Sequence, residues 1–398
     1  MQRILHALIF FIVVLYSSYV YLYFYQTGAI SFKPLYWHFL TIVYALVLII
    51  LRMPSFLDGT HRLFIFWIWA FVCNSIVCFL YSPQGNLEVE ALYESIRVSV
   101  LILSFCIILQ GDSAIRLSRL AFLIVLLFSV AMNIVDFTMP MWSKVPGRAA
   151  GLFVNPTIAG KMLVLMMVVG LPLVPRKIRL AYCALVGVGV LVTFSRGPWF
   201  LWLIAIIGLS VSGHLESSRK AMSIIIVSFL SGFVVYNALT GGFLDILTAT
   251  GLDEYLTRGT LARLGDNGTA FSDNSTVSRA AAAAKAWAVF SEYPLFGAGL
   301  GHDQGWTVGA HNTYLRFAAE GGIFRLGIFI GLLVVLWYIA DSIGRITLVV
   351  YAASSMVSHN NLEAPPLLLI LALIVASSRI KNSDNHIGPY DSKLLPIK

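Results

Sequence analysis

Charged residues are scarce in this chain. Lys, Arg, Asp and Glu supply 12% of the 398 residues, whereas hydrophobic residues supply 59%. A soluble globular domain carries about 25% charged residues. The shortage of charge excludes a soluble globular protein and predicts an integral membrane protein.

Cysteines and paired carboxylates are also scarce. All four cysteines fall inside apolar runs, where they are expected to pack as small apolar side chains rather than to form a disulfide or a metal site. The expected external segments hold few, scattered Asp and Glu residues and no Asp-x-Asp pair. The sequence therefore predicts no metal ligands, so Lys or Arg side chains would have to neutralise any anionic ligand.

Long polar segments are absent from most of the chain. Runs of about 20 apolar residues, the length that crosses a bilayer as a helix, predict an all-α polytopic fold with about twelve transmembrane helices. The first run follows Arg3 and resembles a signal peptide, but no small-residue cleavage site follows it, so we expect a retained helix. The predicted helices lie near residues 4–26, 34–51, 63–82, 92–110, 115–136, 157–174, 179–195, 198–213, 221–239, 313–341, 345–358 and 364–379.

The distribution of Lys and Arg orients these helices. With the N-terminus in the cytoplasm, about 15 of the 27 Lys and Arg residues fall on the cytoplasmic side, as the positive-inside rule requires. Both termini are then expected in the cytoplasm. The expected divisions are transmembrane helices one to nine in 1–239, an external helical loop subdomain in 240–312, transmembrane helices ten to twelve in 313–381 and a cytoplasmic tail in 382–398.

The connection between residues 239 and 313 is far longer than an ordinary loop. Its Ala-rich run Thr276–Phe290 predicts a helix that ends before Pro294. The Gly-rich turn Pro294–Gly301 follows, and its small residues predict close packing of the backbone. No strand precedes this turn, which excludes a dinucleotide-binding motif. The loop also carries four of the expected external cations and two histidines, namely Arg258, Arg263, Arg279, Lys285, His302 and His311.

Two further cations, Arg148 and Arg196, lie in small-residue turns on the same external face. Arg196 precedes Gly197-Pro198 between two predicted helices, and Arg148 precedes Asn155 in a similar turn. The orientation of the chain does not require these cations, and a guanidinium group offers a planar fork that suits phosphate oxygens. Several arginines at the height of the bilayer surface predict a site for a lipid phosphate or pyrophosphate. For Lys144, we prefer simple solvation.

His311 lies where the cationic loop re-enters the membrane. Nearby positive charge would lower the pKa of its imidazole and keep the ring neutral, which is the form that a general base needs. The alternative is a hydrogen-bonded histidine at the membrane–water boundary without a chemical role.

These motifs, in this order and topology, resemble those of the bacterial O-antigen ligases, within the O-antigen ligase/polymerase superfamily. The motifs are Thr193-Phe194-Ser195-Arg196-Gly197-Pro198, Ser278-Arg279 before an Ala/Trp-containing helix, the turn Pro294–Gly301, and His311-Asn312-Thr313-Tyr314-Leu315. The resemblance implies a glycosyltransferase of the Gram-negative inner membrane. Such an enzyme moves O-antigen polysaccharide from undecaprenyl pyrophosphate to the lipid A–core oligosaccharide on the periplasmic face, without a metal or another cofactor.

The resemblance also assigns residues. His311 matches the catalytic histidine, and Arg196 and Arg279 lie in matching contexts for pyrophosphate binding. Arg263 is a looser match, because the loop before Ser278 varies in length, and Arg148 is added from its placement alone. We expect secondary roles for Asn155, Asn312 and Tyr314. The expected partners are the lipid-linked donor, the lipid A–core acceptor and membrane lipid, with no nucleic acid.

Three other functions fit the same features less well. An O-antigen polymerase would use the same donor but a second lipid-linked glycan as acceptor, and a related oligosaccharyltransferase would glycosylate a protein. A transporter or flippase for lipid-linked sugars is the alternative from another class. The gathering of cations on one face disfavours a transporter. So does an expected lack of charge pairs deep within the helices, apart from Arg97 with Glu94.

Overall fold

The computed structural model describes residues 2–52, 59–83, 85–145, 148–215, 274–306, 309–358 and 360–386. Within these ranges the regular structure is entirely helical, which confirms the predicted fold class. Short 3₁₀ helices are labelled η. The helices are α1 (Gln2–Ser17), α2 (Val20–Gln26), α3 (Pro34–Arg52), α4 (Gly59–Leu80), α5 (Asn86–Ile108), α6 (Asp112–Thr138), η1 (Gly151–Phe153), α7 (Pro156–Gly170), η2 (Leu171–Leu173), η3 (Arg176–Ile178), α8 (Arg179–Leu191), α9 (Arg196–Val211), α13 (Asn274–Glu292), α14 (Thr313–Ile339), α15 (Ser342–Ser355) and α16 (Pro365–His386).

Most predicted transmembrane segments coincide with a helix, but their number is not confirmed. Six described helices are long and apolar enough to cross a membrane, and a seventh span arises if α1 and α2, bent by 53° at their junction, count as one. α8 has 13 residues, which rise about 20 Å, less than the roughly 30 Å of a bilayer core. The predicted segment 221–239 lies outside the described residues. The protein is therefore a multi-pass membrane protein, and twelve spans remain a prediction.

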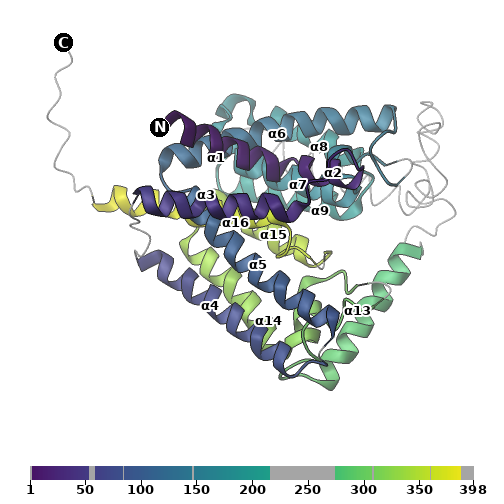
Figure 1. Ribbon diagram of the computed structural model, residues 1–398. Helices are drawn as coiled ribbons and strands as arrows, with labels where there is room; N and C mark the ends of the chain where they lie inside the picture. Colours follow the sequence, from purple (N-terminus) through teal and green to yellow (C-terminus); the bar gives the residue numbers. More distant parts are fainter. Residues whose placement is uncertain are drawn as a thin grey trace, which may run out of the picture.

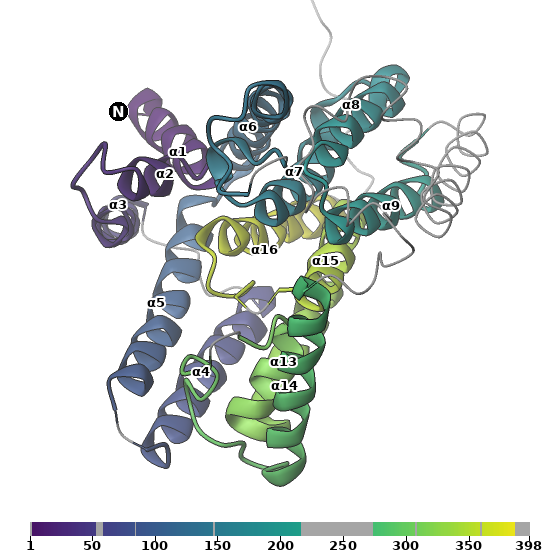
Figure 2. The ribbon, with the colours of Figure 1, turned by 90° about the vertical axis from the view of Figure 1, so that its right-hand side faces the viewer.

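α7 and α16 form the interior of the larger group of helices (Figure 2). α7 packs against α6, α8, α9 and α15, and α16 packs against α5. The side chains of Met162–Val168 in α7 and of Leu367–Ala372 in α16 are fully buried. A helix that is apolar on every side is stable only when other helices surround it, so these two segments position the rest.

α4, α5, α13 and α14 extend away from this larger group (Figure 1). α14 packs against α4 and α13, and α5 connects the two groups through its contacts with α3 and α16. α13, the helix predicted from the Ala-rich run, lies on the first part of α14. Ala286, Ala310 and Ala319 are buried together at this contact, because small side chains let two backbones approach closely.

The Gly-rich turn Pro294–Gly301 fits against a break in α14. Gly321 and Gly322 have non-helical backbone angles, with φ +63° at Gly322. The freed carbonyl groups of Ala319 and Glu320 accept hydrogen bonds from the N–H groups of Ala298 and Gly299, at 2.8 and 3.0 Å. A Cβ atom on Gly297 would lie 2.4 Å from the backbone of Glu320. The predicted close packing of this turn is therefore confirmed.

The expected lack of deep charge pairs is wrong. In α14 the buried Arg316 and Arg325 both contact Glu320, each at 3.1 Å. The glutamate bridges them because the break at Gly321-Gly322 brings Arg325 back beside it. Arg316 also pairs with Asp303 and Glu363, which come from distant segments. Sequence spacing reveals the Arg316–Glu320 pair, but the other contacts depend on tertiary structure.

Candidate functional site

The two small-residue turns that carry Arg148 and Arg196 lie side by side. The N–H group of Ala149 donates to the carbonyl of Val192 at 3.1 Å, and the Nε–H of Arg148 donates to the carbonyl of Thr193 at 3.0 Å. Arg148 is buried and Arg196, the first residue of α9, is half-buried. The structure thus brings together two of the predicted anion-binding residues, with Arg148 also bonded to the backbone just before Arg196.

The start of α7 packs closely against the turn that carries Arg196. The hydroxyl groups of Thr157 and Ser195 lie 2.9 Å apart, and a Cβ atom on Gly160 would lie 2.6 Å from the ring of Pro198. Asn155, predicted as a ligand, caps this helix: its Oδ1 accepts hydrogen bonds from the N–H groups of Thr157 and Ile158. Its observed role is therefore to begin α7 at the edge of the site.

His311 lies immediately before the N-terminal cap of α14. Asn312 is the cap, and its Oδ1 accepts hydrogen bonds from the N–H groups of Tyr314 and Leu315, at 2.9 and 3.2 Å. The hydroxyl group of Tyr314 donates to the carbonyl of Ala352 at 3.1 Å. Both predicted secondary residues thus hold the first turn of α14 in place, and that turn determines where His311 lies.

The positive charge of Arg279, a residue of α13, affects the pKa of His311. Burial first, and the positive charge of Arg279 second, lower the pKa of the His311 imidazole below its ordinary value. His311 is half-buried, and Arg279 is exposed in the second turn of α13. The direction of this shift agrees with the expected effect of nearby positive charge, although burial contributes more. The other predicted loop arginine, Arg263, lies outside the described residues, as does Arg258.

Backbone strain coincides with these turns. The described non-glycine residues with positive φ are Tyr19, Val154, Phe194 and His311, with values between 46° and 62°. A side chain rarely adopts this conformation unless its surroundings hold it there, and such residues gather at functional sites. Phe194 lies two residues before Arg196, and His311 is the candidate base.

A turn that the sequence did not single out joins the two halves of the site. The hydroxyl group of Thr313 donates to the carbonyl of Ser358 at 2.5 Å. On the other side of that turn, Val357 lies 3.5 Å from the position of a Cβ atom on Gly197. The segment Val357–Asn361 thus touches both the Arg196 turn and the start of α14. Lys161 of α7, which sequence reasoning also missed, binds this segment.

A buried charged cluster lies along α14 beyond His311. Arg316 contacts Asp303 at 3.2 Å and Glu363 at 2.5 Å, besides Glu320. Three carboxyl groups and two guanidinium groups meet here, so one proton would balance the charge. Burial, and then the neighbouring Glu320, raise the pKa of Asp303 to about 7 despite the attraction of Arg316. Within the described ranges, no group of three or more His, Cys, Asp or Glu residues is arranged to hold a metal ion.

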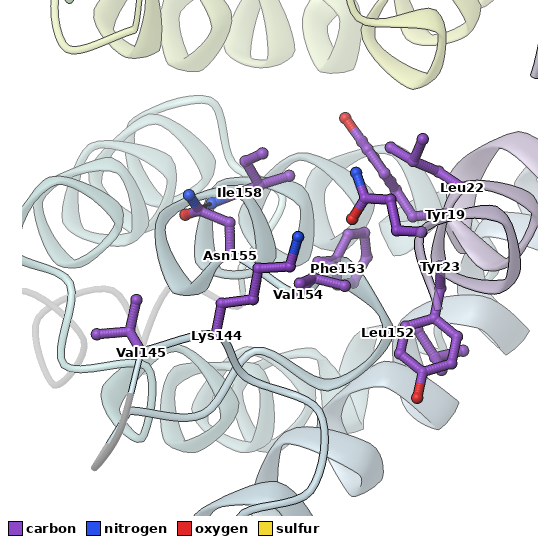
Figure 3. Close-up of a pocket in the computed structure, with 11 residues that line it drawn as sticks. Tyr19, Leu22, Tyr23, Lys144, Val145, Leu152, Phe153, Val154, Asn155 and Ile158 are labelled. Atoms are coloured by element: carbon purple, nitrogen blue, oxygen red, sulfur yellow. Dashed lines mark hydrogen bonds between the residues drawn. The ribbon is translucent and has the colours of Figure 1, made fainter. Parts of the chain in front are cut away.

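A cavity of about 240 Å³ adjoins the Asn155 cap, between α2, the 144–155 segment and the start of α7. Lys144 is the one charged residue of its lining, and in Figure 3 its side chain extends into the space between Asn155 and Phe153. The strained residues Tyr19 and Val154 also line it. Lys144 is exposed, as simple solvation predicts, and it also lines this cavity of mixed polar and apolar walls.

Comparison with known proteins agrees with the motifs. The family model for O-antigen ligase matches residues 181–330, a range that includes Arg196, Arg263, Arg279 and His311. Arg148 and Asn155 precede it. The match confirms the resemblance seen in the sequence. No curated protein matches the chain.

Proposed function

Because residues 181–330 belong to the O-antigen ligase family, we propose that this protein transfers O-antigen polysaccharide from undecaprenyl pyrophosphate to the lipid A–core oligosaccharide. The family by itself supports the coarser statement that the chain acts in O-antigen ligation or polymerisation. A multi-pass helical protein suits a donor and an acceptor that are both anchored in a bilayer. The gathering of cations at one set of turns suits an anionic donor.

We place the reaction on the periplasmic face of the inner membrane. The distribution of Lys and Arg along the sequence supports cytoplasmic termini and an external position for the 240–312 subdomain. α13 and the turn Pro294–Gly301 are the described parts of that subdomain, and both pack on the first half of α14. Arg196, His311 and Arg279 would then face the same compartment.

In the proposed mechanism His311 acts as the general base. Its neutral imidazole accepts the proton of an acceptor hydroxyl group as that oxygen forms a bond to the anomeric carbon of the donor glycan. The bond between the anomeric carbon and the pyrophosphate oxygen breaks at the same time, and its electron pair leaves with undecaprenyl pyrophosphate. Because attack and departure occur on opposite faces, the anomeric configuration inverts.

The arginines would hold the pyrophosphate and stabilise its growing negative charge. Arg196 and Arg279 are the principal candidates, Arg263 is a further one, and Arg148 contributes from beneath the Arg196 turn. The Nε–H of Arg148 donates a hydrogen bond to the carbonyl of Thr193. Arg148 therefore supplies positive charge and also stabilises the Arg196 turn. No step in this scheme requires a metal ion, because guanidinium groups can neutralise the leaving group.

The observation that carries the proposal is the half-buried His311 with a lowered pKa beside Arg279, at the start of α14 and inside the family match. Its test is reconstitution of the purified protein with undecaprenyl-pyrophosphate-linked glycan and lipid A–core in the presence of EDTA. We expect a ladder of glycan on lipid A–core. His311→Ala should reduce the rate by about 10²–10⁴-fold, the usual contribution of a general base, at an unchanged protein level.

The product separates the remaining alternatives. Lengthening of the glycan on its undecaprenyl carrier would identify a polymerase, and glycan on an added protein acceptor would identify a protein oligosaccharyltransferase. Movement of the lipid-linked glycan across vesicles without covalent transfer would identify a transporter. Activity only when divalent metal replaces EDTA would contradict neutralisation by arginines.

A further inference from the structure

Lys161 is a buried cation in the most enclosed helix of the protein. It lies in the middle of α7, and its side chain is 5% exposed. Among the described residues no carboxylate lies within ion-pair distance of its Nζ. An ammonium group removed from water is costly unless the protein supplies acceptors for it, so its contacts identify what it does.

The Nζ group of Lys161 donates to two side chains of one segment. It lies 2.5 Å from Oδ1 of Asn361 and 3.4 Å from Oγ of Ser358. Asn361 is fully buried, and its Nδ2 donates to the hydroxyl groups of Ser354 and Ser355 at the end of α15. Lys161 therefore bonds the described residues Val357–Ser358 and Asn360–Asn361, which we call the linking turn, to the interior of the bundle.

Both halves of the candidate site touch the linking turn. The carbonyl of Ser358 accepts the hydroxyl hydrogen of Thr313, the first residue of α14 and two residues after His311. Val357 packs against Gly197, the neighbour of Arg196. α7 itself reaches the Arg196 turn one helical turn earlier, through Thr157 and Ser195. The linking turn, to which Lys161 is bonded, thus touches both the Arg196 turn and the start of α14.

We propose that Lys161 is a positioning residue, which sets His311 relative to Arg196 through the linking turn. A neutral donor in its place could also bond to Asn361, but it could leave that bond at small cost. A buried ammonium group that loses Asn361 must either keep its charge without adequate acceptors or give up its proton, so the bonded arrangement is favoured. The charged hydrogen bond therefore holds the linking turn against α7.

A positioning role predicts an effect on the rate constant rather than on donor affinity. Misplacing a general base by about 1 Å can cost about 10²-fold in rate, whereas the arginines that bind pyrophosphate remain. We expect Lys161→Met to lower kcat by about 10- to 100-fold with little change in KM for the donor. This catalytic role rests on the proposed transfer reaction, whereas the link from Lys161 to Thr313 does not.

The experiment therefore measures the link and the rate separately, on the full-length protein in detergent. Amide hydrogen exchange reports the first turn of α14, where the N–H groups of Tyr314, Leu315 and Arg316 bond to Asn312. In Lys161→Met we expect exchange there to rise about tenfold or more, with α16 unchanged. Lys177→Met, which removes an exposed cation near the start of α8, is the control and should alter neither exchange nor kcat.

Thr313→Val provides a second variant of nearly the same shape that breaks only the bond to Ser358. It should reproduce both effects, and it replaces Lys161→Met if that variant fails to fold. Unchanged exchange in the first turn of α14, or a normal kcat, in a folded variant would overturn the proposal. A raised donor KM with normal kcat would do the same, because it would place Lys161 in donor binding. A wild-type protein without transferase activity, combined with faster exchange in both variants, would refute the proposed function and leave the link intact.

Discussion

At the scale of single residues, the site combines groups whose surroundings set their chemistry. Burial and the positive charge of Arg279 lower the pKa of the His311 imidazole, and Arg148 donates a hydrogen bond to the turn that presents Arg196. Two of the residues for which we expected secondary roles have structural ones. Asn155 and Asn312 each precede a helix and cap it, which their sequence context, Asn-Pro and Asn-Thr before an apolar run, could have indicated.

The electrostatic effect of Arg279 on His311 can be measured in a pH–rate profile. The base is active when neutral, so kcat/KM falls as the pH drops through the pKa of His311. Arg279→Gln removes a positive charge that lowers this pKa. The acidic limb should therefore move to higher pH, by up to about one unit, in addition to any loss of rate. Lys285→Gln is the control. It removes a positive charge from the same helix, but the ammonium group of Lys285 lies over the ring of Trp306 and is not among the causes of the His311 pKa shift. If the acidic limb does not move in Arg279→Gln, Arg279 does not lower the pKa of His311.

Asp303 should make stability depend on pH. Its pKa is raised to about 7 in the folded protein, above its unfolded value of about 4. Below the unfolded pKa of about 4, the full contribution of Asp303 to the free energy of unfolding is present. This contribution is lost as the pH rises through the folded pKa of about 7. The thermal midpoint of the wild type should therefore fall between about pH 5 and pH 8 relative to that of Asp303→Asn. Parallel curves for the two proteins would contradict a protonated Asp303.

At the scale of elements, α14 is the helix that joins the site to the bundle. His311 lies just before its N-cap, its first two turns carry the buried Arg316 and Glu320, and its longer second part begins after the break at Gly321-Gly322. The Gly-rich turn supplies the hydrogen bonds that the broken helix lacks. The apolar pattern predicted one continuous span here, because two glycines within an apolar run change its mean hydropathy little and do not reveal a break in the helix.

Substitution of Gly322 tests this junction. A Cβ atom there would lie 2.2 Å from the carbonyl oxygen of Leu295, and φ is +63°. Gly322→Ala should therefore destabilise the protein by about 2 kcal/mol or more, with a lower thermal midpoint and lower transferase activity. Gly327→Ala is a matched control in the same helix, since a Cβ atom on Gly327 would contact nothing within 4 Å. Equal midpoints for the two variants would contradict the close fit of the Gly-rich turn.

At the scale of the whole molecule, two groups of helices meet near the candidate site. α7 and α16 form the interior of the larger group, and α4, α5, α13 and α14 form the second group (Figures 1 and 2). α5, α15 and the linking turn connect them. The residues proposed for catalysis come from both groups, since α9 carries Arg196, α13 carries Arg279 and His311 lies just before α14. Any relative movement of the two groups would therefore change the site.

The proposed orientation can be tested by labelling on spheroplasts. In a background without the native cysteines, Ala284→Cys on the exposed face of α13 should react with a membrane-impermeant maleimide from outside. Lys177→Cys, in η3 between α7 and α8, lies in a segment that the charge distribution assigns to the cytoplasm, and it should react only after the membrane is opened. The expectation follows from the distribution of positive charge. The reverse pattern would invert the topology and place His311 in the cytoplasm.

The sequence alone predicted most of the described helices and the resemblance to the O-antigen ligases. Long apolar runs must satisfy their backbone hydrogen bonds internally when they lie in lipid, so their positions follow from composition, and the short motifs around Arg196 and His311 agree with the family match at 181–330. Only the tertiary structure brought Lys161 to Asn361, 200 residues away in the chain, and Arg316 to Glu363. These contacts depend on how the helices pack, and no local pattern records which distant polar group will meet a buried charge.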